Sequence, residues 1–161
     1  MVVMPVGPGA IIIPNCPPPR QGQFSTECYD LCAPPGGAGN FLLSLACTCC
    51  AFGVMTGNAP PGTVPCAGNC CGGCCFASSC PAFAFCLAKN GLRTAYGMPN
   101  GAGELIGDFM CGLLFHGCVT MHLTNEVTIR NNAVALTQGA AMQQQMQMQG
   151  ALHSQRSAGT G

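Results

Sequence analysis

Cysteine thiols are the side chains in this sequence best suited to chemistry, and they occur in groups. The chain has 15 cysteines among 161 residues, and Cys47, Cys49 and Cys50 lie close together. Thiolates are ligands that zinc, cadmium and copper(I) prefer. Residues three apart on a helix share a face, so Cys47 and Cys50 form the predicted pair. Cys49 can join Cys47 at one ion only if the backbone departs from a helix there.

Two further groups carry metal-ligating residue types. The glycines of Cys71-Gly-Gly-Cys74 permit a tight turn that lets both sulfurs meet one ion. Cys118 and His122 are four residues apart and share a helical face close to His116, so this group would complete a four-ligand site with Cys47 or Cys74. The predicted metal ligands, with zinc as the cofactor, are Cys47, Cys50, Cys71, Cys74, His116, Cys118 and His122.

Each group also has a purely structural interpretation. Cysteine packs as a small apolar residue or is acylated, and histidines near the end of an apolar helix are often only amphipathic. A disulfide scaffold is a third alternative, although an odd number of cysteines excludes complete internal pairing. The N-terminus lacks the positive segment of a secretory signal, which predicts a reducing compartment where disulfides are rare.

The scarcity of charge narrows the class of protein. Only 6% of the residues are charged, against about 25% in an average soluble protein. Five basic residues cannot neutralise a run of phosphates, which excludes a nucleic-acid partner. No charged residue lies between Asp30 and Lys89, which predicts contact with a lipid bilayer, with other membrane proteins or with a second copy of the chain. The sequence has no nucleophile triad, P-loop or HExxH motif, so we expect no enzymatic activity.

The elements that must position these residues are predicted to be helical. We expect a mainly α fold with three short apolar helices, at 40–56, 74–90 and 103–130, joined by Pro/Gly-rich loops. A Pro-rich arm (1–23) precedes the cysteine-rich, membrane-associated domain (24–130), and a low-complexity Gln/Met tail (131–161) follows it. Arg93 and Tyr96 are predicted to mark the membrane–water boundary.

Four segments in order resemble one family. They are Gly22-Gln-Phe-Ser-Thr26 followed by Asp30, the segment from Phe41 to Gly53 with its Cys47-Thr-Cys49-Cys, Leu92-Arg93-Thr-Ala-Tyr96-Gly97, and the helix from Asp108 through Cys118 to Glu126. Together they resemble the onzin/cornifelin/plant cadmium-resistance family, whose members are also called cell-number regulators or placenta-specific eight proteins. The chain departs from the family pattern at Phe41, where the family has its first cysteine, and at Thr48, where Cys-Pro-Cys has its proline.

The resemblance implies association with a membrane, that of the cell surface or of an organelle, and binding or export of soft divalent metals. Two other functions remain open. One is a non-catalytic structural or accessory subunit of a larger membrane complex, in which the cysteines only pack. The other is a disulfide-stapled envelope component, similar in role to cornifelin.

Overall fold

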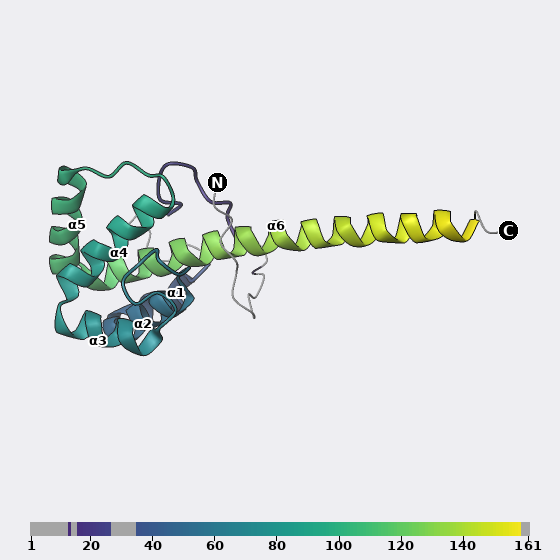
Figure 1. Cartoon of the computed structure of the whole chain (residues 1–161). Coiled ribbons are helices and arrows are strands. Elements are labelled where there is room, and N and C mark those ends of the chain that lie inside the picture. The colour runs from purple at the N-terminus through teal and green to yellow at the C-terminus, as the bar shows by residue number, and fades with distance from the viewer. Residues whose placement is uncertain (1–12, 14–15, 27–34, 159–161) are drawn as a thin grey trace.

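The computed structural model describes residue 13 and residues 16–26 and 35–158, and these form a small helical body from which one long helix projects (Figure 1). Asp30 and most of the Pro-rich arm lie outside the described residues. The helices are α1 (Gly37–Ala46), α2 (Thr48–Asn58), α3 (Cys70–Ser79), α4 (Pro81–Ala95), α5 (Ala102–Leu114) and α6 (His116–Ala158). The described segments contain no strand, which confirms the mainly α prediction.

The prediction of three helices was wrong, because each apolar segment breaks once. The breaks fall at single residues whose backbone dihedrals lie outside the helical region: Cys47 (φ −147°, ψ 78°), Cys80 (φ −146°, ψ 72°) and Phe115 (φ −129°, ψ 40°). At Cys80 the cause is the following Pro81, whose ring disfavours the helical region for the residue before it and which is itself well placed at the start of α4.

The core lies where α2, α4 and the first half of α6 meet. Phe52 on α2 and Phe85 on α4 are fully buried and pack edge to face, with ring centroids 5.2 Å apart. Val119, Leu123 and Val127 recur every fourth residue along α6 and are equally buried. The first half of α6 is therefore the central helix of the body, although its sequence is more polar than that of α5.

Small residues let the elements approach closely. A Cβ atom at Gly73 on α3 would lie 1.9 Å from the Thr56 side chain of α2. At Gly53 on α2 a Cβ would lie 2.6 Å from the Cys70 carbonyl oxygen of α3. No larger side chain fits these positions unless its neighbours move. The glycines thereby bring the cysteines of α3 onto α2.

The length and composition of the helices bear on the predicted membrane association. No single helix in the described ranges is both long and apolar enough to cross a bilayer. The pair Ala102–Leu114 and His116–Gln149 passes on length and composition when taken together, but it is bent by 118° at Phe115.

Candidate metal centre

The break between α1 and α2 creates the candidate site. Cys47 ends α1, where its N–H donates to the Leu43 carbonyl oxygen at 2.9 Å, and it also precedes α2, where its own carbonyl accepts from the Ala51 N–H at 3.0 Å. Because residue 47 leaves the helical conformation, the two-residue spacing no longer separates its sulfur from that of Cys49. The two Sγ atoms lie 3.6 Å apart.

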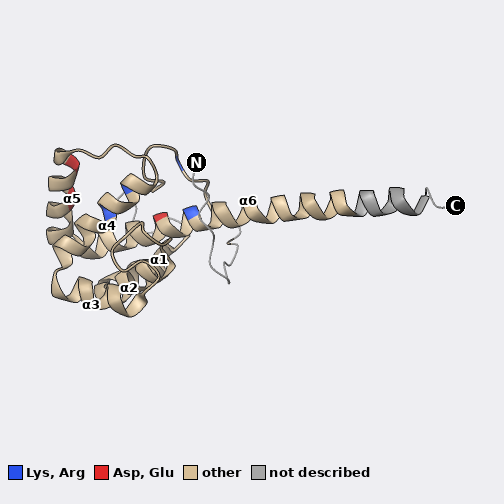
Figure 2. Cartoon of the chain, in the orientation of Figure 1, with Lys and Arg blue, Asp and Glu red and all other residues tan. Residues whose placement is uncertain are grey.

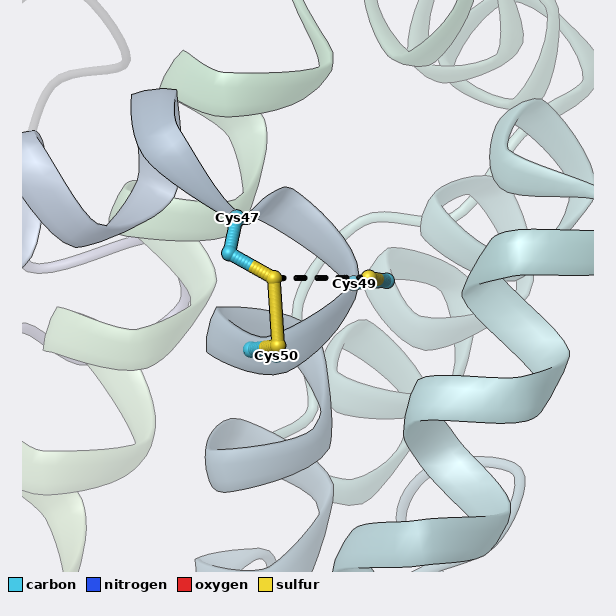
Figure 3. Close-up of side chains that lie close together, drawn as sticks. All are labelled: Cys47, Cys49 and Cys50. Atoms are coloured by element: carbon cyan, nitrogen blue, oxygen red, sulfur yellow. Dashed lines mark hydrogen bonds between the residues drawn. A yellow bond between two sulfur atoms is a disulfide. The ribbon is translucent and has the colours of Figure 1, made fainter.

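Cys50 completes a group of three sulfurs, which all lie within 4.8 Å of one another. Cys47 and Cys50 are joined by a disulfide, and Cys49 is a free thiol beside it (Figure 3). Cys47 and Cys49 are half-buried, whereas Cys50 is exposed. The group is therefore reachable from solvent.

Helix α3 packs against α2 and brings two side chains next to Cys49. Hydrogen bonds from the Ser78 hydroxyl and then the Cys74 thiol lower the pKa of Cys49, while the same bond with Cys49 raises the pKa of Cys74. Cys49 is thus the thiol of this pair that is more readily ionised.

A pocket of about 350 Å³ opens beside the sulfurs. Cys47 and Cys49 line one side of it, and Ser78 and His116 line other parts of the wall. His116 is the first residue of α6, placed there by the break at Phe115. Cys47, Cys50, Cys74 and His116, all predicted from the sequence, are thus gathered at this site.

The remaining predicted ligands lie elsewhere or do not face the pocket. Cys71 is exposed near the start of α3, and Cys118 is half-buried on α6 without lining the pocket. His122 is buried, with its Nδ1 atom 3.1 Å from the Thr26 hydroxyl and its ring 4.7 Å from that of Phe24. Its ring is thus engaged by the 20–26 segment rather than by the thiols.

Cys49 is the residue that sequence reasoning left out of the ligand set. The helical geometry assumed for residues 40–56 placed it away from Cys47. No proline or glycine stands at the break, so the sequence held no direct signal for it.

The burial of His122 gives the chain a predicted acid sensitivity. Desolvation, and then the charges of Lys89 and Arg93, lower its pKa to about 3 from an ordinary value of 6.5. Below pH 6.5 the His122 side chain is therefore protonated in the unfolded state and stays neutral in the folded state. The free energy of unfolding falls as the pH falls. Between pH 7 and pH 5 we expect a loss of about 2 kcal/mol in the free energy of unfolding, measured by urea titration.

The variant His122→Gln tests this prediction, and His116→Gln is its control. The first variant should flatten the pH dependence between pH 7 and pH 5, and the second, at an exposed position, should leave it unchanged. An unchanged slope in His122→Gln would show that another group is responsible.

Arg93 and Tyr96, predicted to face the membrane boundary, make contacts inside the chain. Arg93 on α4 pairs with Asp108 on α5, with Nη1 and Oδ2 3.0 Å apart. The Tyr96 ring lies under Arg130, whose Cζ is 4.1 Å from the ring centroid. Burial raises the pKa of Tyr96 to about 12.

A second polar cluster holds the 20–26 segment against the body. The buried Glu126 carboxylate accepts from the Ser25 N–H at 2.6 Å and from Arg130 Nε at 2.5 Å. Arg130 also donates to the carbonyl oxygens of Arg20 and Gln23, at 2.9 and 3.2 Å. The segment from Gly22 to Thr26 and the helix around Glu126 are thus in direct contact.

Comparisons of the chain with protein-family models, with curated proteins and with solved structures found no match.

Proposed function

We propose that this chain is a small, non-catalytic thiol protein that binds a soft metal ion, such as zinc or cadmium, through Cys47, Cys49 and Cys50. The observation that carries the proposal is the mutual distance of the three sulfurs, all within 4.8 Å. A zinc ion held tetrahedrally by sulfurs about 2.3 Å away keeps those sulfurs about 3.8 Å apart. The 3.6 Å between the Sγ atoms of Cys47 and Cys49 is close to that value.

A fourth ligand is available across the pocket. His116 lines the same cavity as Cys47 and Cys49, and its side chain is exposed. Three thiolates and one imidazole make a common structural zinc set. The chemistry of the donors thus suits a soft ion and suits calcium or magnesium poorly.

The test is cadmium binding by the fully reduced protein, followed through the thiolate-to-cadmium charge-transfer absorption. Loss of one thiolate ligand in Cys49→Ser should weaken binding by at least the 10–100-fold that even outer-shell changes cause. The matched control is Cys66→Ser, which removes an exposed thiol from the loop between α2 and α3. Equal cadmium affinity in the two variants would contradict the proposal.

A specific observation also favours attachment to the surface of a bilayer. Helix α5 turns Asp108 and Gly112 toward the body, and its opposite face is apolar and exposed. Ile106 is 66% exposed and Leu114 is 61% exposed, and the charged residues of α5 are Glu104 and Asp108 alone. Most of α5 is therefore uncharged (Figure 2). We propose that this face lies in the membrane interface, as amphipathic surface helices do.

This second proposal predicts flotation of the protein with phosphatidylcholine vesicles. Burial of each large aliphatic side chain contributes about 1.5–3 kcal/mol, so Ile106→Asp combined with Leu114→Asp should reduce the bound fraction at least tenfold. Met142→Asp, at a 60% exposed position on the projecting part of α6, is the matched control. If both variants float like the unmodified chain, α5 is not the membrane contact.

A further inference from the structure

The same sulfurs that would hold the ion also form the disulfide. Cys47 and Cys50 belong to the three-sulfur group, and they are bonded to each other in this structure. A disulfide sulfur carries no negative charge and is a poor ligand, so closing this bond removes two of the three thiolates at once. The oxidised group and the metal-loaded group therefore exclude each other.

We propose that the Cys47–Cys50 pair is a redox gate on the metal site, which closes by thiol–disulfide exchange with a low-molecular-weight disulfide and thereby releases the ion. The inference rests on the proposed metal binding and adds its regulation. The spacing supports it, because Cys47 immediately precedes α2 and Cys50 lies in its first turn, with Cα atoms 5.3 Å apart. That distance lies within the range that a disulfide spans.

The exchange needs no oxidant other than the small disulfide. The Cys47 thiolate attacks a sulfur of the small disulfide, forms a mixed disulfide and expels one thiolate. The Cys50 thiolate then attacks the Cys47 sulfur, forms the Cys47–Cys50 bond and expels the second thiolate. Two protein thiolates are oxidised, one small disulfide is reduced to two thiols, and the metal ion leaves.

The surroundings of Cys47 and Cys50 favour exchange with an external small disulfide over exchange with another cysteine of the chain. Cys50 is exposed and Cys47 lines the pocket of about 350 Å³, so a small disulfide can reach both. Cys49 is close, but its sulfur lies beside the disulfide bond and not along its axis, which is the direction a displacing thiolate needs (Figure 3). Cys49 therefore remains as a free thiol that keeps one ligand in place for reloading.

The experiment follows cadmium release from the reduced, loaded protein in glutathione buffers of increasing oxidised fraction at constant pH. Cadmium release is read with a metal indicator, and the Cys47–Cys50 bond is read by differential alkylation and peptide mass spectrometry. We expect the two curves to coincide. Cys50→Ser also lacks one ligand, so it is loaded at a cadmium concentration that saturates it. It cannot close the bond, so oxidation should no longer be linked to release, whereas Cys66→Ser should behave as the unmodified chain.

Thermodynamic reciprocity provides an independent check. The factor by which the disulfide weakens cadmium binding must equal the factor by which saturating cadmium shifts the exchange equilibrium toward the dithiol. Both factors can be measured on the same protein.

The outcomes separate the two proposals. If the reduced chain binds no cadmium, both the metal site and the gate are overturned. If it binds cadmium and the chain with a closed Cys47–Cys50 bond binds it equally well, the gate alone is overturned. Oxidation that joins other cysteines first, such as Cys49 and Cys74, would also overturn the gate.

Discussion

Asp108→Asn is expected to destabilise the folded chain by about 3–5 kcal/mol, the cost of removing one partner from a buried ion pair. The Asp108 side chain is 6% exposed, and its Oδ1 atom lies 2.7 Å from Nζ of Lys89. Its other oxygen pairs with Arg93, whose side chain is 13% exposed. The amide would leave two largely buried cations on α4 without a counter-charge, next to the Phe24 ring.

Urea unfolding at pH 7 measures this loss, and Glu104→Gln on the same helix is its control. Glu104 is exposed in the first turn of α5, so neutralising it should change stability by less than about 1 kcal/mol. Adding Lys89→Met to Asp108→Asn should restore part of the lost stability, because one unpaired charge is removed with it. A loss below about 1 kcal/mol in Asp108→Asn would mean that water reaches the pair.

Glu126→Gln is expected to cost about 3 kcal/mol and to release the 20–26 segment. Glu126 is fully buried, and its two oxygens accept from the Ser25 N–H, the Ser25 hydroxyl and Arg130. An amide of the same size turns an NH₂ group toward one of these donors. Arg130, which also binds carbonyl oxygens of the segment, then loses its charged partner.

Limited trypsin digestion distinguishes local release from global unfolding. Cleavage after Arg20 reports the segment, whereas cleavage after Lys89 or Arg93 within α4 reports opening of the body. Glu126→Gln should raise the first rate more than the second under conditions where the chain stays folded. Equal acceleration at both places would show that Glu126 stabilises the body as a whole and not the docking of the segment.

Helix content was predictable from the sequence because long apolar segments alternate with Pro/Gly loops. The break at Cys80 is the one that the sequence could indicate, since a proline at position 81 disfavours the helical region for the residue before it. The breaks at Cys47 and Phe115 were not predictable, because tertiary packing decides them: Gly117, just after the second break, packs against the Ser44 carbonyl oxygen of α1. Local propensity contains no information about such contacts.

Burial does not follow the apolar residues of the segment 103–130. The side chains of Ile106, Met110 and Leu114, in its more apolar first half, are exposed. The fully buried residues come instead from the more polar second half, such as Asn125 and Glu126. Polar residues can be buried there because they bond to Ser25, Asn40 and Arg130, partners that are distant in the sequence or that periodicity does not reveal.

The candidate site was predictable in its ligand types and only partly in its members. Cys47 and Cys50 follow from their spacing, and Cys74 and His116 were named without any way to tell that they would lie near them. Cys118 and His122 are four residues apart on one helix, but the His122 ring lies against Phe24. Spacing within one element thus predicted candidate pairs, and packing between elements selected among them.

The two ends of helix α6 differ in local stability, although the helix is continuous. Its first turns are clamped in the body, whereas Met142 and Met146 are 60% and 65% exposed on a part that extends beyond the body (Figure 1). Most helical stability in proteins comes from tertiary packing, which the projecting part lacks. Amide hydrogen exchange along α6 should therefore quicken progressively past Thr137, so that its end frays and re-forms many times while the amides near Val127 stay protected until the whole chain unfolds.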